Sequence, residues 1–358
     1  MEQRVDPMQM LDLMVRPGFC VKDHTIVKVN QGALSHLVTL DMDIRELLLT
    51  GKTEYEEFQG GCLYLTLSIS GQQYGASVSR MGDFDVFLLE SQEDQAELQA
   101  MALAARELRE PLNSVMTTAE RLFPMTALQE DPALQDQVAR MNRGLLQMLR
   151  VISNMSDANR YAAAAPARQE TRDICSMLEE VFSHCAELIA HGDLQLTFRN
   201  LETPIYCLVD SEKLERAVLN ILSNAIKFTP RGGRIDASLT RRGNMLYLCI
   251  QDSGSGITKN LKGSIHSRYQ RQPALEDSRY GIGLGMVLIR SAAAVHGGTV
   301  LVDQPEGTGT RITMTLAIRQ NTEPMMRSPM LRVDYAGERD HGLLEFSETL
   351  PAFLYEVN

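Results

Sequence analysis

Two asparagines and a lysine recur at helical spacing in the second half of the chain. Asn220, Asn224 and Lys227 stand at positions i, i+4 and i+7 of a stretch that begins near Asp210, so a helix brings them onto one face. Asparagine amides can ligate Mg²⁺ or bond phosphate, and a nearby lysine can neutralise phosphate charge. The pattern therefore indicates a metal–phosphate site, although a solvated helix face that tolerates asparagine would show the same spacing.

An aspartate and two glycines follow a strand-like run. Met245–Ile250 leads into Asp252, Gly254, Gly256 and Ile257. An aspartate at a strand end can accept a hydrogen bond from an exocyclic amine, and glycines let the backbone approach a ligand closely. The same residues also suit a simple hairpin turn, so this motif alone leaves both interpretations open.

A second glycine cluster precedes a helical stretch. Gly281, Gly283 and Gly285 lead into residues 287–296, and unpaired amides at the positive start of a helix form a phosphate site. The spacing departs from the dinucleotide-binding fingerprint, and the chain contains no P-loop sequence. A further motif, Gly307–Thr310, separates two strand-like runs and is typical of a hairpin turn.

The segment 258–280 is basic within an acidic protein. Its net charge is +3, whereas the whole chain carries −11. A locally basic segment between two glycine motifs indicates an anionic ligand, although chance clustering of charge would look the same. The charged residues are Lys259, Lys262, Arg268, Arg271 and Arg279 against Glu276 and Asp277.

These motifs need a mixed scaffold to position them. Residues 168–318 combine helical and strand-like patterns. Residues 10–90 show short strand-like runs separated by turn signals, with a helical piece at 31–40, and this predicts a small α+β domain of the sensor type. The runs are 19–22, 26–29, 63–69 and 84–89.

Between these regions, residues 93–160 predict two long helices. Apolar residues alternate at spacings of three and four in two seams, which is a heptad pattern. An antiparallel hairpin buries only part of each seam, so a second copy would complete a four-helix bundle. A single hairpin packed on a neighbouring domain is the alternative. The seams are Leu98, Met101, Ala105, Leu108, Leu112, Val115, Ala119, Leu122 and Leu134, Val138, Met141, Leu145, Met148, Ile152, Met155.

Composition sets limits on the protein class. A chain of 358 residues predicts two or three domains, and 44% hydrophobic with 23% charged residues is typical of globular proteins. The acidic balance disfavours a general nucleic-acid or anionic-membrane binder. No apolar run approaches the roughly 20 residues of a spanning helix, no signal-peptide pattern opens the chain, and the six cysteines form no Cys-x-x-Cys pair. We therefore expect a cytoplasmic protein without membrane insertion.

In this order, the motifs of the second half resemble the ATP-binding domain of sensor histidine kinases, the Bergerat fold shared with gyrase, heat-shock-90 and mismatch-repair ATPases. The resemblance covers about 150 residues and rests on N-x-x-x-N-A-x-K-F, D-x-G-x-G-I, G-x-G-L-G-M, H-G-G and G-T-G-T. It implies that Mg·ATP binds, with 258–280 as the mobile lid. The lid departs from the family, because 265–269 keeps one aromatic residue where I-F-x-x-F is usual.

The resemblance gives each motif a role. Asp252 would bond the adenine amine, Asn224 with Asn220 would hold Mg²⁺ against the phosphates, and Lys227 would contact phosphate. ATPases of the wider fold place a glutamate base where this chain has Asn220, so we expect no fast ATP hydrolysis. The remaining nucleotide-binding residues that the resemblance implies are Gly254, Gly256, Ile257, Gly281, Gly283, Leu284, Gly285 and Thr310.

Arg106–Leu112 resembles the H-E-L-R-x-P-L motif of the family's phosphotransfer hairpin, with Arg106 in place of the phosphoacceptor histidine. A neutral imidazole is nucleophilic near pH 7, whereas a guanidinium stays protonated and has no free lone pair. No histidine falls within 93–160, and Glu110 stands where phosphatase-competent members often have threonine or asparagine. Glu107 is the acid that would assist an acceptor, or simply an exposed charge beside an arginine.

The start of the chain, Phe19–Asn30, resembles a PAS sensor domain through its strand–turn–strand pattern leading into a helix. The expected fold is α+β and multidomain, with a Bergerat-type α/β sandwich as its ATP-binding part. For the C-terminal extension, docking and disorder both fit its mildly apolar runs. The domains are a PAS-like domain at 1–90, an antiparallel helical hairpin (a four-helix bundle on dimerisation) at 91–162, the ATP-binding domain at 163–318 and the extension at 319–358.

Two classes of function follow. One is a dimeric sensor-histidine-kinase-like protein that binds Mg·ATP and couples sensing to a two-component phosphorelay. The other is a pseudokinase, an ATP-gated interaction module for a response regulator or a partner kinase. A third option keeps kinase activity towards an acceptor in another protein. Arg106 favours the pseudokinase, and the intact nucleotide motifs favour retained nucleotide use.

Overall fold

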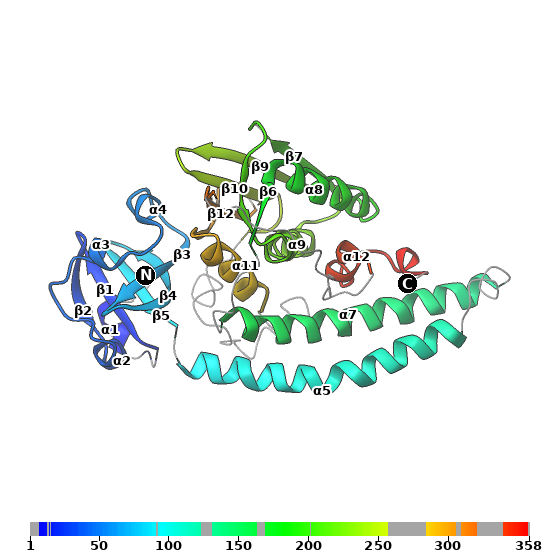
Figure 1. Ribbon diagram of the computed structural model, residues 1–358, viewed down its shortest axis with the longest axis horizontal. Helices are drawn as coiled ribbons and strands as arrows, with labels where there is room; N and C mark the ends of the chain where they lie inside the picture. Colours follow the sequence, from blue (N-terminus) through cyan, green and yellow to red (C-terminus); the bar gives the residue numbers. More distant parts are fainter. Residues whose placement is uncertain are drawn as a thin grey trace, which may run out of the picture.

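The computed structural model describes three parts and a C-terminal segment. Figure 1 shows an N-terminal part at one end (blue to cyan), a long helical hairpin along the base, and a central part above the hairpin (green to orange). The C-terminal segment, in red, lies beside the hairpin. The described residues are 7–12, 14, 16–90, 92–122, 131–162, 169–200, 202–256, 284–305, 309–320 and 339–356.

The N-terminal part (residues 7–90) is an antiparallel sheet with the strand order β2-β1-β5-β4-β3. In its core Phe19 and Phe87 stack with 4.9 Å between ring centroids. The helix expected at 31–40 ends at Ser35, and Leu37 has a φ of 63°, which an α-helix does not accommodate. Its elements are α1 (Pro7–Asp12), β1 (Gly18–Lys22), β2 (Thr25–Val29), α2 (Gln31–Ser35), α3 (Ile44–Leu47), α4 (Lys52–Glu56), β3 (Cys62–Ile69), β4 (Gln72–Met81) and β5 (Phe84–Leu89).

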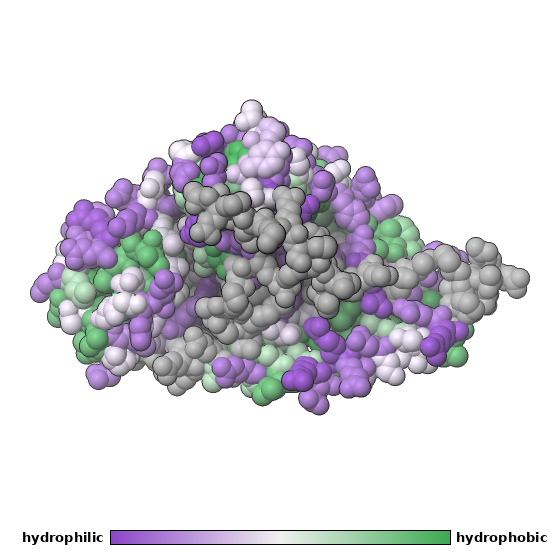
Figure 2. Space-filling view, in the orientation of Figure 1, coloured by the Kyte–Doolittle hydropathy of each residue, from purple (hydrophilic) through white to green (hydrophobic). Residues whose placement is uncertain are grey.

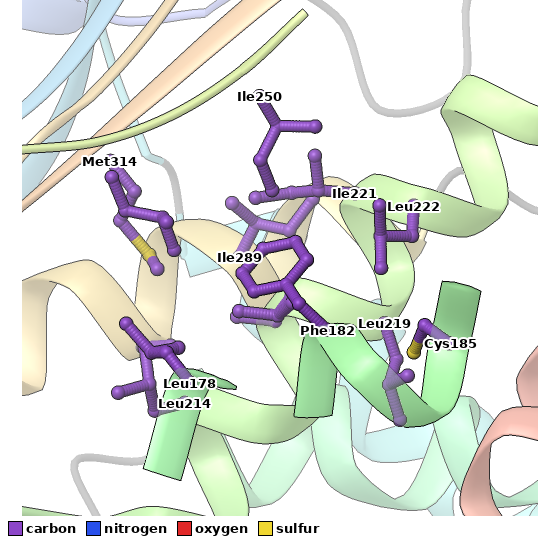
Figure 3. Close-up of a cluster of buried hydrophobic side chains, with 14 of the residues drawn as sticks. Leu178, Phe182, Cys185, Leu214, Leu219, Ile221, Leu222, Ile250, Ile289 and Met314 are labelled. Atoms are coloured by element: carbon purple, nitrogen blue, oxygen red, sulfur yellow. The ribbon is translucent and has the colours of Figure 1, made fainter. Parts of the chain in front are cut away.

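The central part (residues 169–320) packs helices onto one face of a second set of strands. Figure 3 shows its core, where side chains from α8, α9 and α11 meet Ile250 and Met314 of the sheet. Its elements are β6 (Glu170–Asp173), α8 (Ile174–Ala190), β7 (Gln195–Asn200), β8 (Tyr206–Val209), α9 (Ser211–Phe228), β9 (Arg234–Arg242), β10 (Met245–Asp252), α11 (Leu284–Val295), β11 (Val300–Asp303) and β12 (Arg311–Ala317).

Strand β10 explains how a core strand delivers a polar side chain. Its side chains alternate between buried and half-buried positions, so Leu246, Leu248 and Ile250 all point towards the helices. Asp252 is the next position on that same face, at the point where the strand ends. The aspartate is therefore buried by the same alternation that builds the core.

Apart from β6 and β8, which pair with each other in a separate two-stranded sheet, the strands of the two parts form one continuous sheet. Strand β3 pairs antiparallel with β11, with Leu63 opposite Leu301 and Tyr64 opposite Val300. The full order is β2-β1-β5-β4-β3-β11-β12-β10-β9-β7, and β7 runs parallel to β9. The N-terminal part is thus hydrogen-bonded edge to edge to the central part.

The hairpin consists of α5 (Gln92–Leu122) and α7 (Pro132–Ala162), which run side by side in opposite directions (Figure 1). On α5 the seam divides in two: every second seam position is buried, whereas Leu108, Val115 and Leu122 are 51%, 53% and 66% exposed. Figure 2 shows small hydrophobic patches among the hydrophilic surface along the lower edge, where α5 lies. The buried positions of that seam are Leu98, Ala105, Leu112 and Ala119.

Residues 339–356, which we call the docked segment, pack against α7, α8 and α9. The segment contains α12 (His341–Glu345) and a short 3-10 helix, η3 (Ala352–Tyr355). Its apolar side chains join the core of the central part and are buried: Leu344, Phe346, Leu350 and Tyr355. The sequence left both docking and disorder open for the C-terminal extension, and residues 339–356 are docked. None of the described helices has the length and apolar character needed to cross a membrane.

Candidate nucleotide site

Asp252 is the best-defined acceptor of the candidate site. The residue is 7% exposed, and its Oδ1 accepts hydrogen bonds from the amides of Gly254 (2.8 Å) and Thr310 (3.2 Å). Both of these hydrogen bonds go to Oδ1, and none of the described residues donates to Oδ2, so Oδ2 can accept a hydrogen bond from an amine. Burial raises the pKa of Asp252, although both amide bonds favour the charged form.

Two glycines allow the backbone to close around Asp252. A Cβ on Gly254 would collide with the carbonyl oxygen of Phe228, at the end of α9. A Cβ on Gly309, whose φ is 100°, would collide with the backbone carbonyl of Asp252 itself. The motif at 307–310 by itself suggested a hairpin turn, and the family resemblance implied that Thr310 binds nucleotide. The structure places the end of this motif directly against the aspartate.

The predicted polar face of α9 is present. The helix begins at the cap Asp210, whose side chain accepts a hydrogen bond from the amide of Lys213. Asn220 is buried, and its amide nitrogen donates to the carbonyl of Arg216 at 2.9 Å. Asn224 is half-buried, one turn further along the helix.

Asn220 also connects α9 to the second glycine motif. Its Oδ1 lies against Gly285, because a Cβ built there would come within 2.9 Å of that oxygen. Leu284, the residue before, is buried against Leu98 and Ala158 of the hairpin, so its side chain faces the hairpin. The structure therefore joins four of the sequence motifs through contacts at Phe228, Asn220 and Thr310.

Several predicted site residues lie outside the described part of the chain. They are Ile257, Gly281 and Gly283, together with the basic segment 258–280. Their roles as nucleotide contacts and as a lid stay predictions.

His296 fixes the start of α9 from the far end of α11. Its Nε2 accepts a hydrogen bond from the amide of Asp210 at 3.0 Å, and its Nδ1 lies 2.7 Å from the carbonyl of Ala292. These contacts fit a neutral ring protonated at Nδ1. Burial lowers the pKa of His296, and this favours the same form. The H-G-G motif thus has a positioning role.

Arg216 and Lys227 belong to a charged interface that the sequence did not reveal. Arg216 is fully buried and forms an ion pair with Asp157 of α7, and its Nη2 donates to Asn154 at 2.8 Å. The Nζ of Lys227 lies 2.8 Å from the carboxylate of Glu348 in the docked segment. The spacing already placed Arg216 on the same helix face as Asn220. Its partners could not be predicted, because they lie far away in the sequence.

The hairpin motif occupies a different environment. Arg106 and Glu107 are exposed on α5, and among the described residues neither forms an ion pair. Glu107 thus has the exposed position of a surface charge, and its role as an acid beside an acceptor stays a prediction.

Comparison with known proteins agrees with these motifs. Residues 209–320 match the family described as histidine kinase-, DNA gyrase B- and HSP90-like ATPases. A sensor-like histidine kinase of Rhizobium meliloti is 27% identical over 273 residues, which is 72% of this chain and 51% of the relative. Sensor histidine kinase RppB of Synechocystis is 30% identical over 228 residues, which is 63% of this chain and 50% of the relative. The chain spans about half the length of these two relatives.

Among solved structures, full-length ShkA superposes with a TM-score of 0.50 over 63% of this chain and 47% of that one, at 21% identity. This likeness concerns the fold.

Proposed function

The chain is a histidine kinase family protein, and from this premise we propose that it binds Mg·ATP at the site outlined by Asp252, Asn224 and Lys227. One observation carries the proposal: the described motifs meet through direct contacts at Gly254–Phe228, Asn220–Gly285 and Asp252–Thr310. The ShkA structure is described as a complex with AMPPNP, and we extend nucleotide binding from that protein to this chain.

Each side chain has a role that follows from its surroundings. Asp252 Oδ2 accepts from the adenine amine, because Oδ1 is already bonded to two amides. Asn224, with Asn220, would ligate Mg²⁺ through amide oxygens, and Lys227 would neutralise phosphate charge. Bound Mg²⁺ screens the charge of the phosphates. The amides at the start of α11, near Gly285, would donate to the phosphates.

We further propose that the hairpin of this chain accepts no phosphoryl group. Arg106 is exposed at the position of the acceptor, and its guanidinium has no lone pair to attack phosphorus. The protein then acts in two-component signalling in the cytoplasm as a nucleotide-responsive module for a response regulator or a partner kinase. Phosphorylation of an acceptor in a partner protein is the alternative, favoured by the retained nucleotide motifs.

We propose a homodimer formed through the exposed half of the α5 seam. Leu108, Val115 and Leu122 recur every seven residues and stay more than half exposed in one chain. A second hairpin would bury them in a four-helix bundle. Sedimentation should give a dimer for the natural chain and a monomer for Val115→Glu, and a natural monomer at tens of micromolar would contradict the proposal.

Asp252→Asn tests the nucleotide site. The two amides keep the acceptor oxygen at Oδ1, so the new NH₂ group takes the place of Oδ2 and faces the adenine amine donor to donor. We expect ATP affinity, measured by calorimetry, to fall at least about tenfold, or ~1.4 kcal/mol. Asp236→Asn, on neighbouring β9, is the matched control and should bind like the natural chain. Equal affinity in Asp252→Asn would reject this site.

Incubation with ATP labelled on the γ-phosphate tests the missing acceptor. The natural chain should take up no acid-labile label, because Arg106 cannot be phosphorylated on nitrogen by this route. Arg106→His restores an imidazole within the remaining motif, and acid-labile label there would show that the rest of the machinery is competent. Acid-labile label on the natural chain would instead reject the pseudokinase assignment.

A further inference from the structure

The docked segment is anchored by apolar and backbone contacts as well as by its charges. Its apolar side chains are buried in the core of the central part, and its backbone carbonyls accept hydrogen bonds from α7. Asn142 donates to the carbonyl of Tyr355 at 3.0 Å, while Arg143 (2.7 Å) and Gln147 (2.8 Å) donate to that of Ser347. The segment therefore has a fixed register along the hairpin.

This register places two glutamates against the cations beside the candidate nucleotide site. Glu345 is fully buried, its carboxylate lies 2.9 Å from Arg150 Nε, and its backbone carbonyl accepts from Ser223 of α9. One turn further, Glu348 Oε2 lies 2.8 Å from Lys227 Nζ and 3.4 Å from Arg150 Nη1. Burial opposes ionisation of Glu348, yet its bonds to Lys227 and Arg150 lower its pKa overall.

The Glu348 carboxylate and a nucleotide phosphate would compete for the same ammonium group of Lys227. An ammonium is one positive charge with three donors, and it serves as the counter-charge of a carboxylate or of a phosphate. The side chain of Lys227 is only 11% exposed, so little solvent screens its interaction with Glu348. A phosphate that takes this cation must first displace the carboxylate.

We propose that the docked segment inhibits nucleotide binding from within the same chain. The Glu348 carboxylate pairs with the Lys227 ammonium that a nucleotide phosphate would otherwise contact, and we call this inhibition the brake. The inference rests on the proposed function of the site and adds its regulation. Nucleotide and segment then oppose one another: whatever loosens the contact at Glu348 raises affinity for ATP, and bound ATP weakens that contact by the same factor.

Glu348→Gln in the full chain tests the brake, with ATP and adenosine as the two ligands. The amide keeps the shape of the side chain and removes its charge, and the apolar anchor is untouched. We expect ATP to bind about three to ten times more tightly than to the natural chain, since a half-buried ion pair no longer competes. Adenosine has no phosphate and should bind both proteins equally.

Two controls isolate the contact. Glu356→Gln makes the same substitution within the docked segment, where Glu356 bonds Gln135 and not Lys227, and it should leave ATP affinity unchanged. With Lys227→Met as background, Glu348→Gln should bring no gain, because the contested cation is gone.

The outcomes separate the brake from the site itself. If the natural chain binds ATP and Glu348→Gln shows no gain, or gains equally with adenosine, the brake is wrong and the nucleotide site stands. If neither protein binds ATP or adenosine, the proposed function fails and the brake with it.

Discussion

The central part is joined to the rest of the chain on two sides, and the two joints use different chemistry. Towards the N-terminal part, β3 and β11 pair through their backbones, assisted by an ion pair between Arg290 and Glu90. Towards the hairpin and the docked segment, apolar packing is combined with a cluster of charged side chains that have little or no exposure to solvent: Arg150, Asp157, Arg216 and Glu345.

This difference determines what each joint tolerates. A backbone ladder survives most side-chain changes, but it fails where an added atom separates the strands. A buried charged cluster is strongly destabilised when one of its charges is removed, because an opposite charge then stays buried without that partner. The first joint is thus suited to holding two parts rigidly, and the second to changing with charge.

The largest effect should come from Arg216→Met in the charged cluster. The change leaves the carboxylates of Asp157 and Glu345 in a buried position without their shared cation. We expect the free energy of unfolding, measured in urea, to fall by about 3–5 kcal/mol. The exposed pair Arg140–Asp136 on the same hairpin is the control, and Arg140→Met should cost less than about 1 kcal/mol. If Arg216→Met loses as little stability as the control, the charged cluster does not hold these parts of the molecule together.

The sequence could predict the elements that follow from local patterns, but not the contacts between distant segments. The alternation of β10 and the helical spacing of α9 are local patterns, so the strand, the helix and their polar residues were predictable. So were two long helices from their heptad seams. The buried role of Arg216 was not, because a charged residue on a polar helix face normally meets water, and its partners come from two distant segments.

Long-range pairing was also beyond the sequence. Strands β3 and β11 each have the pattern of an ordinary strand, and nothing in either pattern specifies the other as its neighbour. The docked segment was equally ambiguous, since its mild apolarity fits an exposed tail as well as a packed one. The contact between Glu348 and Lys227 follows only from that docking.

A medium effect is expected from Gly61→Ala at the backbone joint. Gly61 has a φ of 91°, and a Cβ there would collide with the carbonyl of Val302 in β11. Gly71→Ala is the matched control, because Gly71 has a φ of 82° but open space around it. Both pay the cost of a left-handed conformation, about 1–2 kcal/mol.

Gly61→Ala should lose about 1–3 kcal/mol more than its control through the collision. Amide hydrogen exchange along Val300–Val302 should accelerate in Gly61→Ala and stay slow in Gly71→Ala. Equal exchange in the two variants would mean that the sheet does not depend on close approach at this point.

The smallest effect concerns His296, which holds α9 from within the central part and so belongs to neither joint. Burial lowers its pKa, so below its ordinary value of 6.5 the unfolded chain takes up a proton that the folded chain does not. The free energy of unfolding should therefore decrease as the pH falls below about 6.5, by up to about 1.4 kcal/mol per pH unit. His296→Gln cannot titrate, and its urea unfolding at pH 7.5, 6.5 and 5.5 should show a shallower dependence. Parallel curves for the two proteins would mean that this histidine does not keep its neutral, amide-accepting form in the fold.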